Sequence, residues 1–246
     1  MAFRFILFAC LTAALFVARL PASWMDHVVS ELTEGRVRLA SSEGSLWQGR
    51  AMLAAADPQR HLIAVRPLEW RFGIQAAPLA VSFELHGSER LLASLLLRPA
   101  GVQVRSLEID LPLASLTQAV SHPVARAGWQ GRLDIRSAGL FCNWRGHCDG
   151  RLIADWLDAA LDIVPGRRFG DHRLNIAASG EALQLHLHSL DSEFRIEARG
   201  AIDSGGQFAL QGTIEGDPEI VDRLPNIMDR NARPSGQPGR TRIQFP

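Results

Sequence analysis

Apolar and polar residues alternate along much of this chain, and this alternation constrains the fold more than any other feature. In residues 79–86 the sequence LAVSFELH places leucine, valine and phenylalanine on one face of an extended chain and mostly polar residues on the other. Residues 107–111 repeat the pattern as LEIDL. Because a period of two buries one side of a strand, the pattern predicts a β-sheet with one apolar face.

Turn-forming sequences such as SG, DS, DSGG and EGD separate the alternating segments, at a spacing of roughly ten to twelve residues. This spacing is typical of antiparallel meanders. We therefore expect a mainly β fold, in which an antiparallel meander forms a curled or sandwich-like sheet with a few short helices. The expected strands are residues 37–40, 44–54, 61–65 and 68–72 (or one strand broken at Pro67), 79–85, 102–111, 129–135, 150–156, 173–177, 183–187, 194–202, 208–214 and 240–245, and the expected helices are 23–34, 113–120 and 218–230.

The longest apolar run is FILFACLTAALFVA, residues 5–18, between Arg4 and Arg19. Fourteen helical residues cover about 21 Å, less than a hydrocarbon core of about 30 Å, which suits the core of a signal peptide. The residues that follow contain no clean A-x-A cleavage sequence, however, and the flanking arginines can reach the head groups. We expect an uncleaved signal anchor, with a cleaved signal peptide and a buried helix of a cytosolic domain as the alternatives.

Acidic residues after the run favour an N-terminus on the cytoplasmic side. Asp26, Glu31 and Glu34 follow Arg19, so the positive charge is concentrated before and at the end of the run. This predicts a membrane anchor in residues 1–20 and an exported β-rich domain in residues 21–246.

The composition excludes several classes of function. The 26 basic and 26 acidic residues balance, so no net field attracts nucleic acid or anionic lipid. Every basic residue is arginine, which removes lysine-dependent mechanisms such as Walker-type phosphate loops and Schiff bases. The motifs GxSxG, HExxH, a GxGxxG that opens a helix and an EF-hand loop are missing from the sequence. We expect no enzyme and no cofactor, and an unrecognised catalytic triad remains the alternative.

Two groups of polar residues deserve comparison with metal sites. His186 and His188 project from the same face of an expected strand and could chelate a metal, but that face is opposite three leucines and is expected to be solvated. Asp155 and Asp158 are likewise expected at a solvated rim. We expect no metal site.

Three cysteines are present. Cys10 lies within the apolar run, where it acts as a small apolar residue. Cys142 and Cys148 have five residues between them and would face an oxidising compartment if the anchor is present, so we expect a disulfide that closes a short hairpin. A metal site that includes His147 and a pair of free thiols are the alternatives.

A short W-x-G sequence occurs repeatedly. Trp47-Gln48-Gly49-Arg50 recurs as Trp129-Gln130-Gly131-Arg132, and Trp144-Arg145-Gly146 is a looser copy. A tryptophan at the start of a strand packs on the core, and a glycine two residues later leaves room for that ring or allows a bulge. We expect structural sheet corners, at which loss of a buried Trp47 or Trp129 ring costs about 3–5 kcal/mol.

Several motifs together resemble the type II (general) secretion pathway protein N family. Their order along the chain matches the family's. They are the short N-terminal apolar segment, an LP sequence with an amphipathic helix, GSLWQG at 44–49 (Gly44, Trp47, Gly49), LEWRF at 68–72 (Trp70), GWQGRLDI at 128–135 (Trp129, Gly131), GRLxADW at 150–156 (Trp156) and the closing GRTRIQF.

This resemblance implies an accessory protein of the bacterial inner membrane with a single membrane pass and a periplasmic domain. It would act in the type II secretion system, which moves folded exoproteins across the outer membrane, and its partners would be other secretion subunits, contacted through an exposed sheet edge or the W-x-G loops. The family also resembles AsmA-like envelope proteins. The alternative function is therefore an AsmA-like periplasmic lipid-binding or lipid-bridging module, whose apolar face is an open groove.

Overall fold

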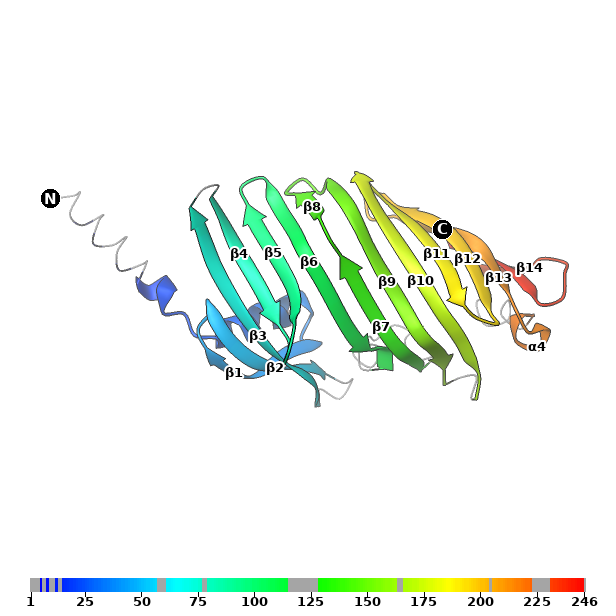
Figure 1. Ribbon diagram of the computed structural model, residues 1–246, viewed down its shortest axis with the longest axis horizontal. Coiled ribbons are helices and arrows are strands. Elements are labelled where there is room, and N and C mark those ends of the chain that lie inside the picture. Colours follow the sequence, from blue (N-terminus) through cyan, green and yellow to red (C-terminus); the bar gives the residue numbers. More distant parts are fainter. Residues whose placement is uncertain are drawn as a thin grey trace.

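The described strands form one antiparallel sheet (Figure 1). This computed structural model describes Phe5, Phe8 and Thr12 and residues 15–56, 61–76, 79–114, 128–162, 166–203, 205–222 and 231–245. Neighbours in sequence pair from β1 to β7 and from β9 to β13, so the predicted meander is confirmed. β8 pairs with β6 and β9, and β15 lies between β13 and β14.

The strand bounds agree with most of the expected segments. They are β1 Val37–Gly44, β2 Gln48–Ala56, β3 Leu62–Ala76, β4 Leu79–His86, β5 Leu91–Arg98, β6 Gly101–Pro112, β7 Trp129–Ser137, β8 Leu140–Asn143, β9 Cys148–Leu161, β10 Arg168–Gly180, β11 Ala182–Asp191, β12 Arg195–Ile202, β13 Phe208–Glu215, β14 Ala232–Pro234 and β15 Arg240–Phe245. Of the two alternatives at Pro67, one continuous strand is correct. β3 tolerates this proline because the pairing of β3 with β4 ends at Glu69 and His86, so Pro67 has a strand on one side only.

β5 was not predicted, because its sequence LLASLLLR lacks alternation. Residues on both of its faces are buried: Leu92 and Leu96 are on one parity, and Ala93 is on the other. A strand covered on both sides reads as a continuous apolar run, so a period of two cannot detect it.

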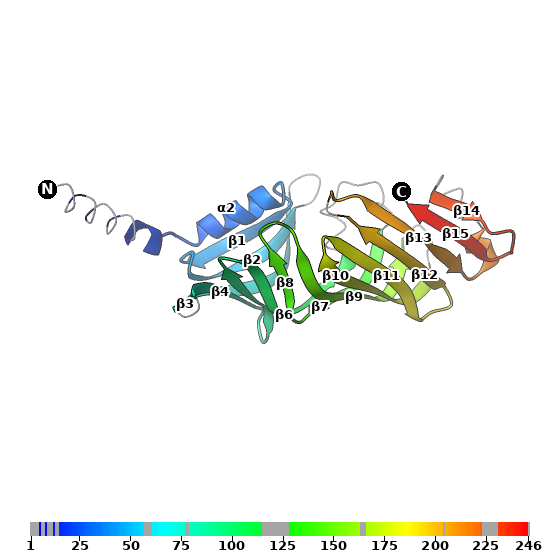
Figure 2. The same ribbon diagram turned by 90° about the horizontal axis from the view of Figure 1, so that it is seen from above.

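The sheet is curled and is not a sandwich in the part of the chain that the structure describes, since all its strands belong to one sheet. Seen from above, both ends of the sheet bend toward the same side (Figure 2). The helix α2 (Ser23–Leu32) lies on that side over the first strands. The expected helix at 23–34 is therefore confirmed, with its end two residues earlier.

Two groups of buried apolar side chains stabilise the two curled ends. The first group lies between α2 and strands β1 to β6, and the second lies among β11 to β15. The first contains Ala22, Leu39, Ala51, Leu68, Trp70 and Leu92, with Met25, Val29, Leu53, Phe72, Phe83, Leu85 and Ile109 packed against it; the second contains Ala198, Ala232 and Ile243, with Leu187, Leu210, Ile214 and Phe245.

Some expectations concern residues outside the described ranges. Within the run 5–18, the structure describes Phe5, Phe8, Thr12 and residues 15–18, which are helical. No helix among the described residues has both the length and the apolar character needed to cross a bilayer. Most of the expected helix 113–120 also lies outside the described residues, and at 218–230 the structure describes a helix α4 (Pro218–Val221), while residues 223–230 lie outside.

Candidate functional site

The turn between β1 and β2 holds the segment that leads out of the N-terminal helix. We call residues 17–22 the stem. The stem and the turn pair as a short antiparallel bridge between Pro21 and Ser45. Three hydrogen bonds join them: Leu46 N–H donates to the Leu20 carbonyl (2.8 Å), Ala22 N–H to the Gly44 carbonyl (3.2 Å) and Trp47 Nε1–H to the Val17 carbonyl (2.9 Å). The GSLWQG sequence therefore fixes the stem to the sheet.

Trp70 is the buried ring beside this turn. It is 3% exposed, and its Nε1–H donates to the Leu46 carbonyl at 3.0 Å. Gly49 lies opposite Trp70 in register, and a Cβ on Gly49 would lie 2.5 Å from Cζ2 of the indole. The space at this glycine therefore serves Trp70, and the expectation that it serves Trp47 is wrong. Trp47 is half-buried and contacts Phe72 edge-on, with ring centroids 6.0 Å apart.

The second W-x-G sequence forms a related arrangement on β7 and β9. Trp156 Nε1–H donates to the Gln130 carbonyl at 2.8 Å, and its ring lies 4.9 Å from that of the half-buried Trp129. Gly131 has a φ of 103°, and a Cβ there would lie 2.4 Å from the Leu157 carbonyl oxygen. The register between β7 and β9 shifts at this glycine, so a bulge is present as one of the sequence alternatives predicted. We call the two arrangements the first corner (Trp47, Gly49, Trp70) and the second corner (Trp129, Gly131, Trp156).

The third copy differs from both corners. Trp144 is 62% exposed, and its Nε1–H donates to the Pro99 carbonyl at 2.9 Å. A Cβ on Gly146 would meet nothing within 4 Å. Trp144 is thus a surface ring on the hairpin between β8 and β9.

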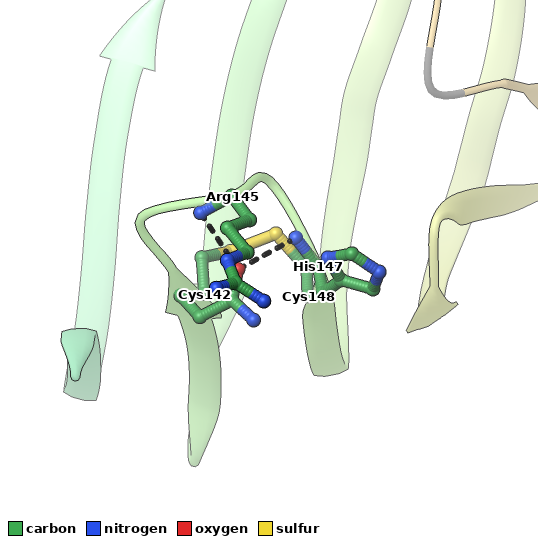
Figure 3. Close-up of a disulfide and its surroundings, with 5 residues drawn as sticks. Cys142, Arg145, His147 and Cys148 are labelled. Carbon is green, nitrogen blue, oxygen red and sulfur yellow. Dashed lines mark hydrogen bonds between the residues drawn. A yellow bond between two sulfur atoms is a disulfide. The ribbon is translucent and has the colours of Figure 1, made fainter.

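A disulfide joins Cys142 at the end of β8 to Cys148 at the start of β9 (Figure 3). The Asn143 side-chain oxygen accepts hydrogen bonds from the backbone N–H groups of Arg145 (2.9 Å) and His147 (3.0 Å) and so closes the turn. The His147 ring points away from the two sulfur atoms (Figure 3). The hairpin is therefore closed both by a covalent bond and by an Asx-type turn.

Asp155 corrects the expectation of a solvated rim. It is 2% exposed, and its carboxylate accepts hydrogen bonds from Arg173 Nε (2.6 Å) and Nη2 (2.9 Å), and also from Arg136. The bonds from Arg173 hold the pKa of this carboxyl below its ordinary value against the opposing effect of burial, and Arg136 adds to the effect. Asp158 is exposed, as expected.

Asp155 belongs to a polar row that crosses the sheet on the face opposite the apolar groups. Each member is in register with the next. The row consists of Asp110 on β6, Asp134 on β7, Asp155 on β9, Arg173 on β10, His188 on β11 and Glu197 on β12. The alternation seen in the sequence thus becomes a continuous charged stripe, in which arginines neutralise the neighbouring carboxylates.

The histidine pair is part of this polar face. The rings of His186 and His188 lie 4.9 Å apart, and His186 Nε2 lies 2.7 Å from Glu197 Oε1. The contact with His186 lowers the pKa of Glu197. Within the described ranges, no group of three or more His, Cys, Asp or Glu residues has a geometry that could hold a metal ion.

A third histidine was missed by the sequence analysis. His172 is 1% exposed on the apolar side of β10, against the Trp156 ring, and its Nδ1 lies 3.0 Å from Ser189 Oγ. Burial lowers the pKa of His172, which favours the neutral ring. In the sequence it follows an aspartate and precedes an arginine, so no apolar pattern marked it as a core residue.

The family model "Type II secretion system (T2SS), protein N" matches residues 35–244. The chain belongs to the type II secretion system protein N family. The match begins just before β1 and ends in β15, so it includes both corners, the disulfide hairpin and the polar row. The resemblance noted in the sequence is confirmed, and this family is not a family of known enzymes. Among curated proteins and among solved structures, no match was found.

Membership of the protein N family suggests contacts with other secretion components, and the sequence analysis expected an exposed sheet edge as one way to make them. Addition of a strand is restricted at the two terminal strands of the described sheet, β1 and β14. At β1, the Thr33 hydroxyl bonds the N–H and carbonyl of Val37, and Asp26 accepts the N–H of Leu39 at 2.7 Å. At the other end, β14 has three residues and contains Pro234, which has no N–H. An added strand would find few free backbone groups at these two edges.

Proposed function

We propose that this protein is an accessory inner-membrane component of the type II secretion system. Residues 1–20 would anchor it with the N-terminus in the cytoplasm, and residues 21–246 would form the periplasmic β-domain. This domain would contact other secretion subunits during the export of folded exoproteins. The observation that carries the proposal is the family match over residues 35–244, which includes nearly the whole β-domain.

The contacts of the stem support a role near a membrane. The stem follows the apolar run 5–18 directly, and it is bonded to the β1–β2 turn by three hydrogen bonds. A flexible tether would need no such attachment. A fixed stem gives the β-domain a defined orientation relative to the membrane, which an adaptor between subunits requires.

We infer that the docking surface adjoins the first corner. A shallow, open cavity of about 760 Å³ lies there, on the polar face of the first strands. It is lined by Glu43, Gly44, Ser45, Gln48, Gly49, Arg50, Glu69, Trp70, Arg71, Glu84 and His86. Exposed charges of both signs around a rigid turn suit a reversible protein contact, in which polar groups determine partner choice. Because the terminal strands β1 and β14 are capped, this surface fits better than strand addition at either of them.

The test is complementation of a gene deletion in the protein's own host, with exoproteins measured in the medium, the periplasm and the envelope. The deletion should leave exoproteins in the periplasm while the permeability barrier stays intact. The wild-type chain and a control with Arg233→Glu and Arg242→Glu, at the opposite end of the sheet, should restore secretion. Arg50→Glu with Arg71→Glu should accumulate in the membrane fraction but fail to restore secretion.

Two outcomes would contradict the proposal at different levels. If the Arg50 and Arg71 variant secretes normally, the docking surface lies elsewhere. If the deletion secretes normally but leaves a leaky or lipid-altered envelope, the type II secretion role fails, and the AsmA-like lipid-binding alternative takes its place. Neither the comparisons nor the described geometry currently favours that alternative.

A further inference from the structure

Helix α2 carries two apolar faces, and only one of them is used within the chain. Met25 and Val29 pack on the first buried group under the helix. Three further apolar side chains point away from the sheet: Trp24 is 49% exposed, Val28 is 43% exposed and Leu32 is 80% exposed. Their spacing of four residues places them in one row along the helix, which we call the outer stripe.

The helix cannot turn the outer stripe inward. Asp26, on the sheet side, bonds Arg38 Nη2 at 2.7 Å and the backbone N–H of Leu39 at 2.7 Å. The bonds to Arg38 hold the pKa of Asp26 below its ordinary value, so the carboxylate remains charged and keeps these contacts at neutral pH. The rotation of α2 is therefore set by β1, and the outer stripe is held outward.

We propose that the outer stripe lies on the surface of the lipid bilayer, with Trp24, Val28 and Leu32 in the boundary between head groups and acyl chains. This inference rests on the anchor in the proposed function. If residues 5–18 lie in the membrane, Arg19 lies at the head groups, and α2 starts four residues later. Ten helical residues span about 15 Å, so chain connectivity keeps the whole stripe close to the bilayer.

The distribution of other exposed apolar side chains favours a flat lipid surface over a protein groove as the occupant. In the stem region, Phe16 is 70% exposed and Val17 is 43% exposed. A flat apolar surface can contact these side chains at the end of the apolar run and the outer stripe together, whereas a groove would cover one of them.

The chemistry of the stripe is also that of an interfacial helix. Trp24 has an apolar ring and one N–H donor, which suits the boundary between head groups and acyl chains. Exposed polar side chains flank the stripe, including His27 beside the Trp24 ring and Glu31. Three apolar residues bind a bilayer weakly alone, but a tethered helix is already held at the surface, so the cost of association is small.

The experiment places an environment-sensitive NBD dye at single cysteines of the full chain, in a Cys10→Ala background that keeps the disulfide. The protein is reconstituted in vesicles of phosphatidylethanolamine and phosphatidylglycerol, with bromine on the lipids either near the glycerol or deep in the acyl chain. The stripe is probed at Val28→Cys and at Leu32→Cys, the anchor at Leu15→Cys, and the exposed polar face at Gln184→Cys. Far-UV circular dichroism verifies that each labelled variant is folded.

We expect the emission of the dyes at Val28 and Leu32 to shift to shorter wavelength and to be quenched most by bromine near the glycerol. The dye at Leu15 should be quenched most by bromine deep in the acyl chain. The dye at Gln184 should remain in water and unquenched. Quenching at Leu15 without quenching at Val28 and Leu32 overturns the inference and leaves the anchor standing. A blue-shifted but unquenched dye at both stripe positions means that protein covers the stripe, and this also overturns it. Unquenched dyes at all three anchor and stripe positions would overturn the anchor itself.

Discussion

Removal of the Trp70 ring should destabilise the β-domain far more than removal of the Trp47 ring, although Trp47 belongs to the recurring W-x-G sequence. Trp70 is 3% exposed, and a tryptophan buries roughly 200 Å², which at about 25 cal/mol per Å² corresponds to about 5 kcal/mol. The lost hydrogen bond to the Leu46 carbonyl adds little, because water can reach this half-buried group. Trp70→Ala should therefore cost about 3–5 kcal/mol, and Trp47→Ala, with its ring half-buried, about 1–3 kcal/mol.

Urea unfolding of the full chain in mild detergent, followed by far-UV circular dichroism, measures both costs. A double-mutant cycle with Gly49→Ala tests the cause, because the added Cβ would lie 2.5 Å from the Trp70 ring and 2.7 Å from the Glu43 carbonyl. Without the ring only the second clash remains, so the two substitutions should couple favourably by about 1 kcal/mol or more. Equal losses at Trp47 and Trp70, or strictly additive costs in the cycle, would refute this account of the first corner.

Three further predictions concern other parts of the sheet. Asp155→Asn should destabilise the domain by about 1–3 kcal/mol at pH 7. Because the folded-state pKa of Asp155 is lowered, the difference in unfolding free energy between the variant and the wild type should shrink as the pH falls below about 4. A pH series of urea midpoints measures this difference, and a difference that stays constant with pH would contradict the prediction. Cys142→Ser with Cys148→Ser should lower the free energy of unfolding by about 2 kcal/mol, because the disulfide closes a short loop. Reduction of the wild-type disulfide should lower the urea midpoint by the same amount. An unchanged midpoint would count against a stabilising role of the disulfide. Gly131→Ala should cost more than the control Gly146→Ala, because both have positive φ but only at Gly131 does a Cβ meet backbone oxygen; equal thermal midpoints would exclude that clash as the cause.

The strand order followed from the sequence because each alternating segment pairs with the next. The exceptions have local causes. β5 is buried on both faces, so it lacks the period of two. β8 has four residues and β14 has three, and such segments are too short for any periodic signal. The choice between a curled sheet and a sandwich was also beyond the sequence, because alternation shows which side is apolar but not what covers it.

The corners were found as motifs but their packing was not. Trp47, Gly49 and Trp70 were each singled out, yet the partner of Gly49 depends on the register between β2 and β3, which places Trp70 directly opposite. A tryptophan of a later long strand also lies beside Gly131, since a Cβ there would lie 3.0 Å from Trp156 Nε1, although Trp156 is opposite Leu133 in register. This repeated order was the available signal, and a search for a second tryptophan after each W-x-G would have identified Trp70 and Trp156 as the second ring of each corner.

The exposure of Asp155 could not be predicted from the sequence. This residue was expected at a solvated rim, and this expectation was wrong because exposure depends on the neighbours across the strands. Arg173 on β10 is in register with Asp155, and Arg136 on β7 reaches it from the other side. Two long side chains can cover a short one that lies between them. The sequence contains all three residues but not the register that brings them together.

The first corner links three features that the sequence presents separately: the apolar N-terminal run, the GSLWQG motif and the amphipathic helix. The stem is bonded to the β1–β2 turn, α2 is fixed to β1 through Asp26, and Trp70 packs beneath the turn against Gly49. Because these contacts share the same two strands, the stem cannot move relative to α2 without breaking hydrogen bonds at the turn. An anchor attached in this way would hold the docking cavity and the outer stripe at one orientation to the membrane. This would explain why the GSLWQG motif lies where the chain enters its β-domain.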